Sequence, residues 1–167
     1  MNIDKELSME ECTGAGIVIY YDNRDFSIKG LQKDIVYLIL TDRRGYYDFP
    51  KGGIDFGEYC FDCALRETDE EINIKRSDFE MFHGEDSKVG FSCGKGLIMF
   101  IGKIKKESIS NTKRKVNEKT GSLEHINNSW LTKEEILSET IVLNGIETNK
   151  LPLYLHKCLN WASQIIV

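Results

Sequence analysis

Short runs rich in β-branched and aromatic residues recur along the chain, separated by polar stretches with turn-forming residues. The runs at 16–21 (GIVIYY), 35–41 (IVYLILT) and 96–104 (GLIMFIGKI) predict buried strands. The segment at 79–83 (FEMFH) predicts a further strand at an edge of the sheet. No apolar run reaches the roughly 18 residues that a membrane-spanning helix needs, so we expect no membrane partner. The pattern therefore predicts a sheet of several strands.

Three other segments carry the signals of helices. Residues 60–72 have apolar side chains at helical spacing, and the Asn73 that follows favours the left-handed conformation that ends a helix. Thr132, with Glu135 three residues later, forms a capping-box signature at the start of a second helix. Pro152 opens a third helix with a broad apolar face. We expect these helices to cover the sheet.

Length and composition favour one folded domain. The chain has 167 residues, of which 41% are hydrophobic and 29% charged, so we expect a single globular domain over 1–167. The net charge of -5 argues against a protein that wraps nucleic acid over its whole surface. The five cysteines have no framework spacing, and we expect free thiols. The acidic N-terminal segment lacks the features of a signal peptide, which favours a cytoplasmic or nuclear location.

Positive charge is concentrated in one polar segment. Residues 103–119 contain seven Lys or Arg and two Glu, and 105–121 is almost free of apolar residues, which predicts a long basic loop or insertion. Two interpretations are open: a solvated loop, or a cationic surface that attracts a polyphosphate or an RNA chain. In the second, Lys113, Arg114 and Lys115 are the candidate substrate contacts.

Negative charge gathers at 52–74 (GGIDFGEYCFDCALRETDEEINI), which has seven acids and one base, Arg66. Glu67, Glu70 and Glu71 are separated by steps of three and four, so their carboxylates lie at neighbouring points of one helix face, opposite the apolar stripe. A divalent cation with oxygen ligands would relieve their repulsion. Mg²⁺ or Mn²⁺ fits this donor set best.

Arg66 is placed to hold this acidic cluster together. It can pair with Glu70 one turn along the helix, or with Glu58 at the helix entry. The segment also has the spacing of the Nudix box: Gly52, five residues, Glu58, seven residues, Arg66-Glu67, two residues and Glu70-Glu71. The chain therefore resembles the Nudix hydrolase superfamily.

Two positions depart from the box of that superfamily. Thr68 stands where an aliphatic residue is usual, and Asn73 stands where glycine is usual. Thr68 keeps β-branched bulk on the buried face, and Asn73 tolerates the left-handed geometry. Neither belongs to the acidic constellation, so we expect the chemistry to be retained.

The resemblance implies a fold and a metal site. The implied fold is a single-domain α/β/α sandwich with a mixed sheet, the box helix on one side and the C-terminal helix on the other. The implied cofactor is Mg²⁺ or Mn²⁺, bound by Glu67, Glu70, Glu71 and the backbone carbonyl of Lys51. Gly52, Glu58 and Arg66 would support this site structurally.

The resemblance also implies catalytic and binding residues. The general base is Glu70, Glu71 or Glu124, because members of the superfamily draw it from either region. Lys95 precedes a predicted central strand at a place where dinucleoside tetraphosphate hydrolases carry a phosphate-contacting lysine. A plain surface lysine is the alternative.

The implied activity is hydrolysis of a phosphoanhydride bond in a nucleoside-diphosphate-linked substrate. The chain looks most like the asymmetric dinucleoside tetraphosphate hydrolases and the messenger-RNA decapping branch, so a dinucleoside polyphosphate or a capped RNA 5′ end is the expected substrate. A diphosphoinositol polyphosphate hydrolase is one alternative, and a non-catalytic binding module of the same fold is another. A purely structural domain would leave the acidic cluster unexplained.

Overall fold

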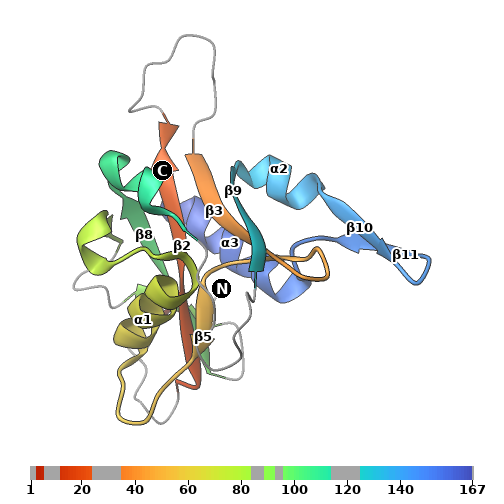
Figure 1. Ribbon diagram of the computed structural model, residues 1–167. Helices are drawn as coiled ribbons and strands as arrows, with labels where there is room; N and C mark the ends of the chain where they lie inside the picture. The colour runs from red at the N-terminus through yellow and green to blue at the C-terminus, as the bar shows by residue number, and fades with distance from the viewer. Residues whose placement is uncertain are drawn as a thin grey trace.

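A mixed β-sheet forms the middle layer of the structure, with helices on both faces (Figure 1). The structure is a computed structural model. It describes residues 3–5, 12–23, 35–83, 89–92, 96–113 and 125–166.

Figure 1 labels the larger elements of the chain. The strands are β1 (Ile3–Lys5), β2 (Gly14–Asp22), β3 (Ile35–Asp42), β4 (Tyr47–Asp48), β5 (Lys51–Gly53), β6 (Phe79–Phe82), β7 (Val89–Ser92), β8 (Leu97–Ile104), β9 (His125–Leu131), β10 (Thr140–Leu143) and β11 (Ile146–Asn149). The α-helices are α1 (Cys60–Ile72), α2 (Lys133–Ser138) and α3 (Leu153–Ile165), and short 3-10 helices are η2 (Arg76–Asp78) and η4 (Lys106–Asn111). All four predicted strands and all three predicted helices are confirmed.

The main sheet has parallel and antiparallel pairs. Its strands run in the order β1-β7-β8-β2-β3-β4, while β5 pairs with β2, β6 with β8 and β9 with β3. The central pair β2–β8 is parallel, and the pairs on either side of it are antiparallel. This topology confirms the predicted mixed sheet.

Strand β2 shows how one sheet carries two cores. Its alternate residues point to opposite faces, so Ile17 packs on the α1 side while Val18 packs on the α3 side. On the first side Ala64 of α1 is fully buried, and on the second Trp161 of α3 is fully buried. The α/β/α sandwich is therefore confirmed, with α1 and α3 on opposite faces (Figure 1).

The ends of α1 and α2 follow the local sequence signals. Asn73 ends α1 in the left-handed region, with φ 64°, and its N–H donates to the Asp69 carbonyl over 3.0 Å. The departure at Thr68 is accommodated because its side chain is fully buried and its hydroxyl donates to the Ala64 carbonyl. The substitutions in the box thus leave the helix intact.

The sequence-based prediction of four strands does not include β1, β4, β5, β7, β9 or the β10–β11 hairpin, and two of these omissions are instructive. Strand β9 carries polar residues and is recognised by its pairing with β3. The β10–β11 hairpin turns at Asn144 and Gly145, which have φ of 53° and 78°. An Asn-Gly pair between short strands is a strong hairpin signal, so this element was predictable from the sequence.

The prediction of free thiols is wrong for Cys12 and Cys60, which form a disulfide with Cα atoms 6.1 Å apart. These cysteines are 48 residues apart in sequence. They meet because the antiparallel pairing of β2 with β5 brings the start of β2 beside the segment that leads into α1. Cys63 and Cys158 are buried and form no disulfide, and burial raises the pKa of the Cys63 thiol to about 12.

The predicted basic loop is partly structured, which corrects the prediction of an irregular segment from 105. Residues 106–111 form η4, in which Ser108 is buried. Past η4, the N–H of Lys113 donates to the Ile72 carbonyl over 2.9 Å, so this segment packs at the C-terminal end of α1. The rest of the predicted loop, 114–121, lies outside the described residues. No helix within the described ranges is long and apolar enough to cross a membrane.

The cap of α2 yields a stability prediction. Thr132 Oγ1 accepts a bond from the Glu135 N–H at 3.2 Å, and Glu135 Oε1 accepts one from the Thr132 N–H at 3.0 Å. Thr132→Ala removes the first acceptor and should lower the free energy of unfolding by about 1 kcal/mol in urea titrations. Thr132→Ser keeps the hydroxyl and is the matched control. Equal stabilities of the Ala and Ser variants would show that the cap contributes nothing.

Candidate active site

The side chain of Arg66 joins α1 to the segment that precedes it. Its Nε donates to Glu58 Oε2 at 2.8 Å and its Nη2 to Glu58 Oε1 at 3.1 Å, a two-bonded arrangement that fixes the guanidinium plane. Nη2 also donates to the Gly53 carbonyl at 2.8 Å. Residues 53–58 are therefore anchored to the helix by one side chain.

The same guanidinium reaches the acids of the helix itself. Nη1 donates to Glu67 Oε1 at 3.0 Å and to Glu70 Oε2 at 3.1 Å. Both pairings expected from sequence, with Glu58 and with Glu70, are thus present. Burial opposes the charged form of Glu58, but hydrogen bonds from Arg66 and the local backbone outweigh it and lower the pKa of Glu58. The pKa of Arg66 is raised, chiefly because its guanidinium donates hydrogen bonds to the Glu58 carboxylate.

The carboxylate of Glu67 lies directly against the backbone of β5. A Cβ atom placed on Gly52 would be 2.1 Å from Glu67 Cδ and 2.3 and 2.4 Å from its two oxygens. Any side chain at this position would displace the carboxylate. Glycine is therefore required at position 52 because a side chain there would clash with the Glu67 carboxylate.

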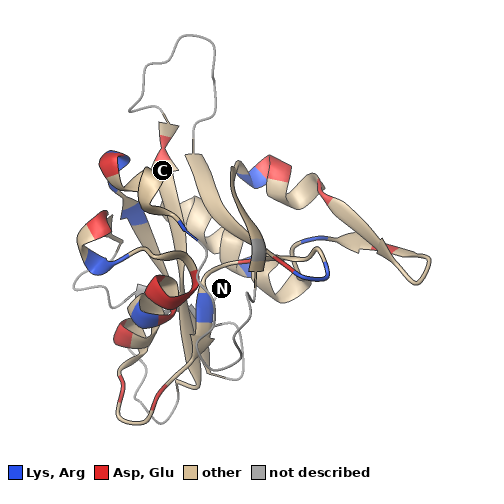
Figure 2. Cartoon of the chain, in the orientation of Figure 1, with Lys and Arg blue, Asp and Glu red and all other residues tan. Residues whose placement is uncertain are grey.

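Glu71 contacts the same short strand one residue earlier. Its Oε2 accepts a hydrogen bond from the Lys51 N–H at 3.3 Å. Since Glu67 and Glu71 are one helical turn apart, their side chains flank the backbone of Lys51 and Gly52. Figure 2 shows the acidic residues gathered on α1 beside β5.

The donor chemistry of this face fits a hard divalent cation. Carboxylate oxygens and a peptide carbonyl are the ligands that Mg²⁺ and Mn²⁺ take in proteins. Within the described ranges no three His, Cys, Asp or Glu side chains are gathered closely enough to hold a metal ion. Instead Arg66 supplies the positive charge between Glu67 and Glu70. Glu70 is the most accessible of the three acids on the face, because 58% of its side chain is exposed.

The remaining predicted site residues are placed as follows. Lys113 is exposed and lies near the C-terminal end of α1. Glu124, Lys95, Arg114 and Lys115 lie outside the described residues. The sequence-based predictions for these four residues therefore stay predictions.

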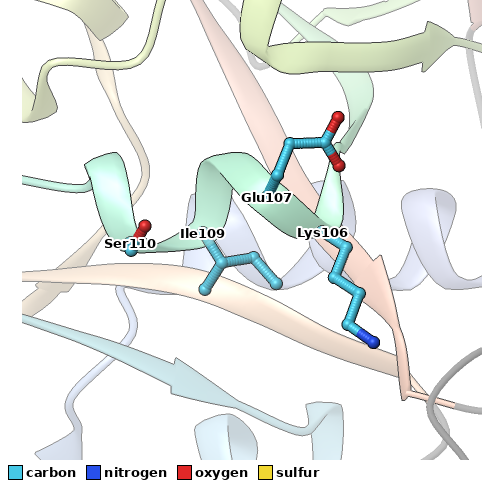
Figure 3. Close-up of a pocket in the computed structure, with 4 residues that line it drawn as sticks. All are labelled: Lys106, Glu107, Ile109 and Ser110. Carbon is cyan, nitrogen blue, oxygen red and sulfur yellow. The ribbon is translucent and has the colours of Figure 1, made fainter.

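A hollow of about 570 Å³ lies at η4, lined by Lys106, Glu107, Ile109 and Ser110 (Figure 3). None of the predicted site residues lines it. The acidic face of α1, with its ordered carboxylates, is the better candidate for chemistry.

Sequence reasoning missed other contacts around α1 and β5. Asp55 forms an ion pair with Arg66 Nε at 3.2 Å, and its place inside the acidic segment was the available signal. Asp48 lies 3.3 Å from Lys51 Nζ, an i,i+3 pair visible in the sequence, and His125 lies 3.5 Å from the same carboxylate oxygen. The contact with His125 joins β4 to β9, which both pair with β3, and has no signal in the local sequence.

Comparison with known proteins gives the family. Residues 14–145 match the family model of the NUDIX domain, and this match covers most of the chain. The RNA pyrophosphohydrolase of Pelagibacter ubique (strain HTCC1062) is 28% identical over 103 residues, which are 61% of this chain and 58% of that protein. The chain thus spans less than two thirds of the length of this relative.

Solved structures share the fold. The Ap4A hydrolase of C. elegans, in a binary complex, has a TM-score of 0.61 at 23% identity, over 92% of this chain and 96% of that one. The Bacillus subtilis pyrophosphohydrolase BsRppH has a TM-score of 0.56 at 11% identity, over 99% and 88%. With the matched domain, the box spacing and the sandwich in agreement, the chain belongs to the Nudix family.

Proposed function

We propose that this protein is a divalent-metal-dependent pyrophosphohydrolase that cleaves a phosphoanhydride bond in a nucleoside-diphosphate-linked substrate. The observation that carries the proposal is the arrangement of Glu67 and Glu71 on the backbone of β5, with Arg66 binding Glu58, Glu67 and Glu70. It lies within the matched domain. An acidic helix that served only as a solvated surface would not require these contacts between its carboxylates, Arg66 and β5.

Glu67, Glu70 and Glu71, with the carbonyl of Lys51, would hold Mg²⁺ or Mn²⁺. When bound, such a cation neutralises phosphate charge and lowers the pKa of a water for in-line attack at phosphorus. Before a cation binds, the guanidinium of Arg66 keeps these carboxylates oriented. The exposure of Glu70 and the bond from the Lys51 N–H to Glu71 support these two residues as candidates for the base that would accept the proton of the attacking water. Glu124 stays a third candidate for this base.

For the substrate, we propose a dinucleoside polyphosphate or a capped RNA 5′ end. The similarity to an Ap4A hydrolase and to an RNA pyrophosphohydrolase supports this pair. The basic segment at 103–119 supports a polyanionic substrate of either kind. All box glutamates are present, which argues against a binding module without activity.

The test is a product profile on a panel of dinucleoside polyphosphates, capped RNA, RNA with a 5′ triphosphate and diphosphoinositol phosphates. We expect nucleotide products from the first two classes. Glu70→Gln and Glu71→Gln should fold normally and lower turnover by about 10² to 10⁴. Asp62→Asn, which removes an exposed acid from the first turn of the same helix, is the matched control and should keep full turnover. Undiminished hydrolysis by folded Glu70→Gln and Glu71→Gln would overturn the site, and cleavage of diphosphoinositol phosphates alone would overturn the substrate class.

A pair of adjacent glycines tests the contact between Glu67 and β5. Gly52→Ala places a methyl group on the Glu67 carboxylate, which is the mobile end of a side chain and is therefore displaced while the fold is retained. Displacing a metal-binding carboxylate by about 1 Å should lower kcat by about 10²-fold. In Gly53→Ala the nearest atom is the Thr13 carbonyl oxygen at 4.0 Å, so this variant should be as active as the wild type. If both variants keep wild-type kcat, the position of Glu67 does not matter for the reaction.

A further inference from the structure

The side chain of Lys51 leaves the acidic face and crosses to the opposite side of the sheet. Its Nζ lies 3.3 Å from Asp48 Oδ2 and near the phenol of Tyr154, in the first turn of α3. Only 20% of this side chain is exposed. One residue of β5 therefore contacts α1 through its backbone and α3 through its side chain.

Asp48 is itself tightly held. Its Oδ1 accepts a bond from the Phe49 N–H at 2.9 Å, while its Oδ2 faces both Lys51 Nζ at 3.3 Å and His125 Nε2 at 3.5 Å. The His125 side chain is only 8% exposed. The Asp48 carboxylate that pairs with Lys51 is thus held by His125 of β9 and by the neighbouring Phe49 N–H.

The neighbouring strand leaves room for this arrangement. A Cβ atom on Gly16 would lie 2.5 Å from Lys51 Cβ and 2.3 Å from the Pro50 carbonyl oxygen. Gly16 and Lys51 are direct partners in the β2–β5 pair. Close approach of the two backbones therefore sets where the Lys51 side chain starts, and the ion pair with Asp48 sets where it ends.

The consequence reaches the acidic face through the peptide of the same residue. The Lys51 N–H donates to Glu71 at 3.3 Å, and its carbonyl belongs to the ligand set proposed above. Any rotation of β5 at Lys51 moves both groups. Groups that orient a metal ligand change metal affinity even though they do not touch the metal.

We propose that Lys51 is a positioning residue whose ion pair with Asp48, on the α3 side of the sheet, holds the backbone of β5 in the orientation that the acidic face of α1 requires. This inference rests on the proposed function. The lysine is not free to bind a substrate phosphate, because its ammonium is already paired with Asp48 and only 20% of its side chain is exposed.

The experiment compares Lys51→Met, Asp48→Asn and Lys51→Arg with the wild-type protein. Lys51→Met removes the charge and keeps the length of the side chain, and Asp48→Asn keeps the bond to the Phe49 N–H but loses the ion pair. Four quantities are measured. They are the Mn²⁺ affinity without substrate, from the electron paramagnetic resonance signal of free Mn²⁺, kcat and KM on the best substrate of the panel, and the melting temperature.

We expect Lys51→Met and Asp48→Asn each to weaken Mn²⁺ binding by about 10- to 100-fold and to lower kcat with KM unchanged. Lys51→Arg restores the ion pair and should recover most of both losses. Lys150→Met is the matched control, since Lys150 pairs with Glu139 at 3.9 Å and is outside the proposed site. If Lys51→Met does not fold, Asp48→Asn carries the test alone.

Three other results would overturn the inference. A raised KM with unchanged kcat and Mn²⁺ affinity would make Lys51 a substrate contact, and a lowered melting temperature alone would make the pair merely structural. Absence of Mn²⁺ binding by the wild type would remove the inference together with the metal site. If the wild type binds Mn²⁺ but cleaves no panel substrate, the proposed function fails while the affinity series still decides the role of Lys51.

Discussion

The guanidinium of Arg66 is the interaction on which the candidate site depends. Four carboxylates lie within ion-pair distance of it: Asp55 at 3.2 Å, Glu58 at 2.8 Å, Glu67 at 3.0 Å and Glu70 at 3.1 Å. Without it, the acids of the loop and of α1 would repel each other. Because 26% of the Arg66 side chain is exposed, solvent screens this network only partly. Arg66 thus allows the acidic face to exist before any cation is present.

The second constraint is steric and comes from β5. Gly52 leaves room for the Glu67 carboxylate, and the Lys51 N–H gives Glu71 a fixed partner. β5 has only three residues, so its position depends on what it is tied to: β2 on one edge, α1 on one face and α3 on the other. This short strand of the sheet therefore depends on contacts from both sides.

Features set by nearby residues were predictable from the sequence. The helix over 60–72, the end of that helix at Asn73 and the cap at Thr132 depend on spacings within a few residues, and the box acids follow from positions on one helix. The Asn144-Gly145 turn also depends on adjacent residues and was predictable in the same way. By contrast, the Cys12–Cys60 disulfide and the approach of His125 to Asp48 bring together distant parts of the chain, and only the strand order determines them. The resemblance to a family implied the sandwich but not these contacts.

Thermal melting in rising Mg²⁺ concentration tests most directly whether the Arg66-held acids form a metal site. A cation that binds only the folded protein stabilises it by about 2.7 kcal/mol at 100 times its dissociation constant, which corresponds to a rise of several degrees in Tm. The account predicts this rise in the wild-type protein, and its loss when Glu67, Glu70 and Glu71 are all changed to Gln. An unchanged Tm across millimolar Mg²⁺ and Mn²⁺, with hydrolysis that persists in a chelator, would contradict it.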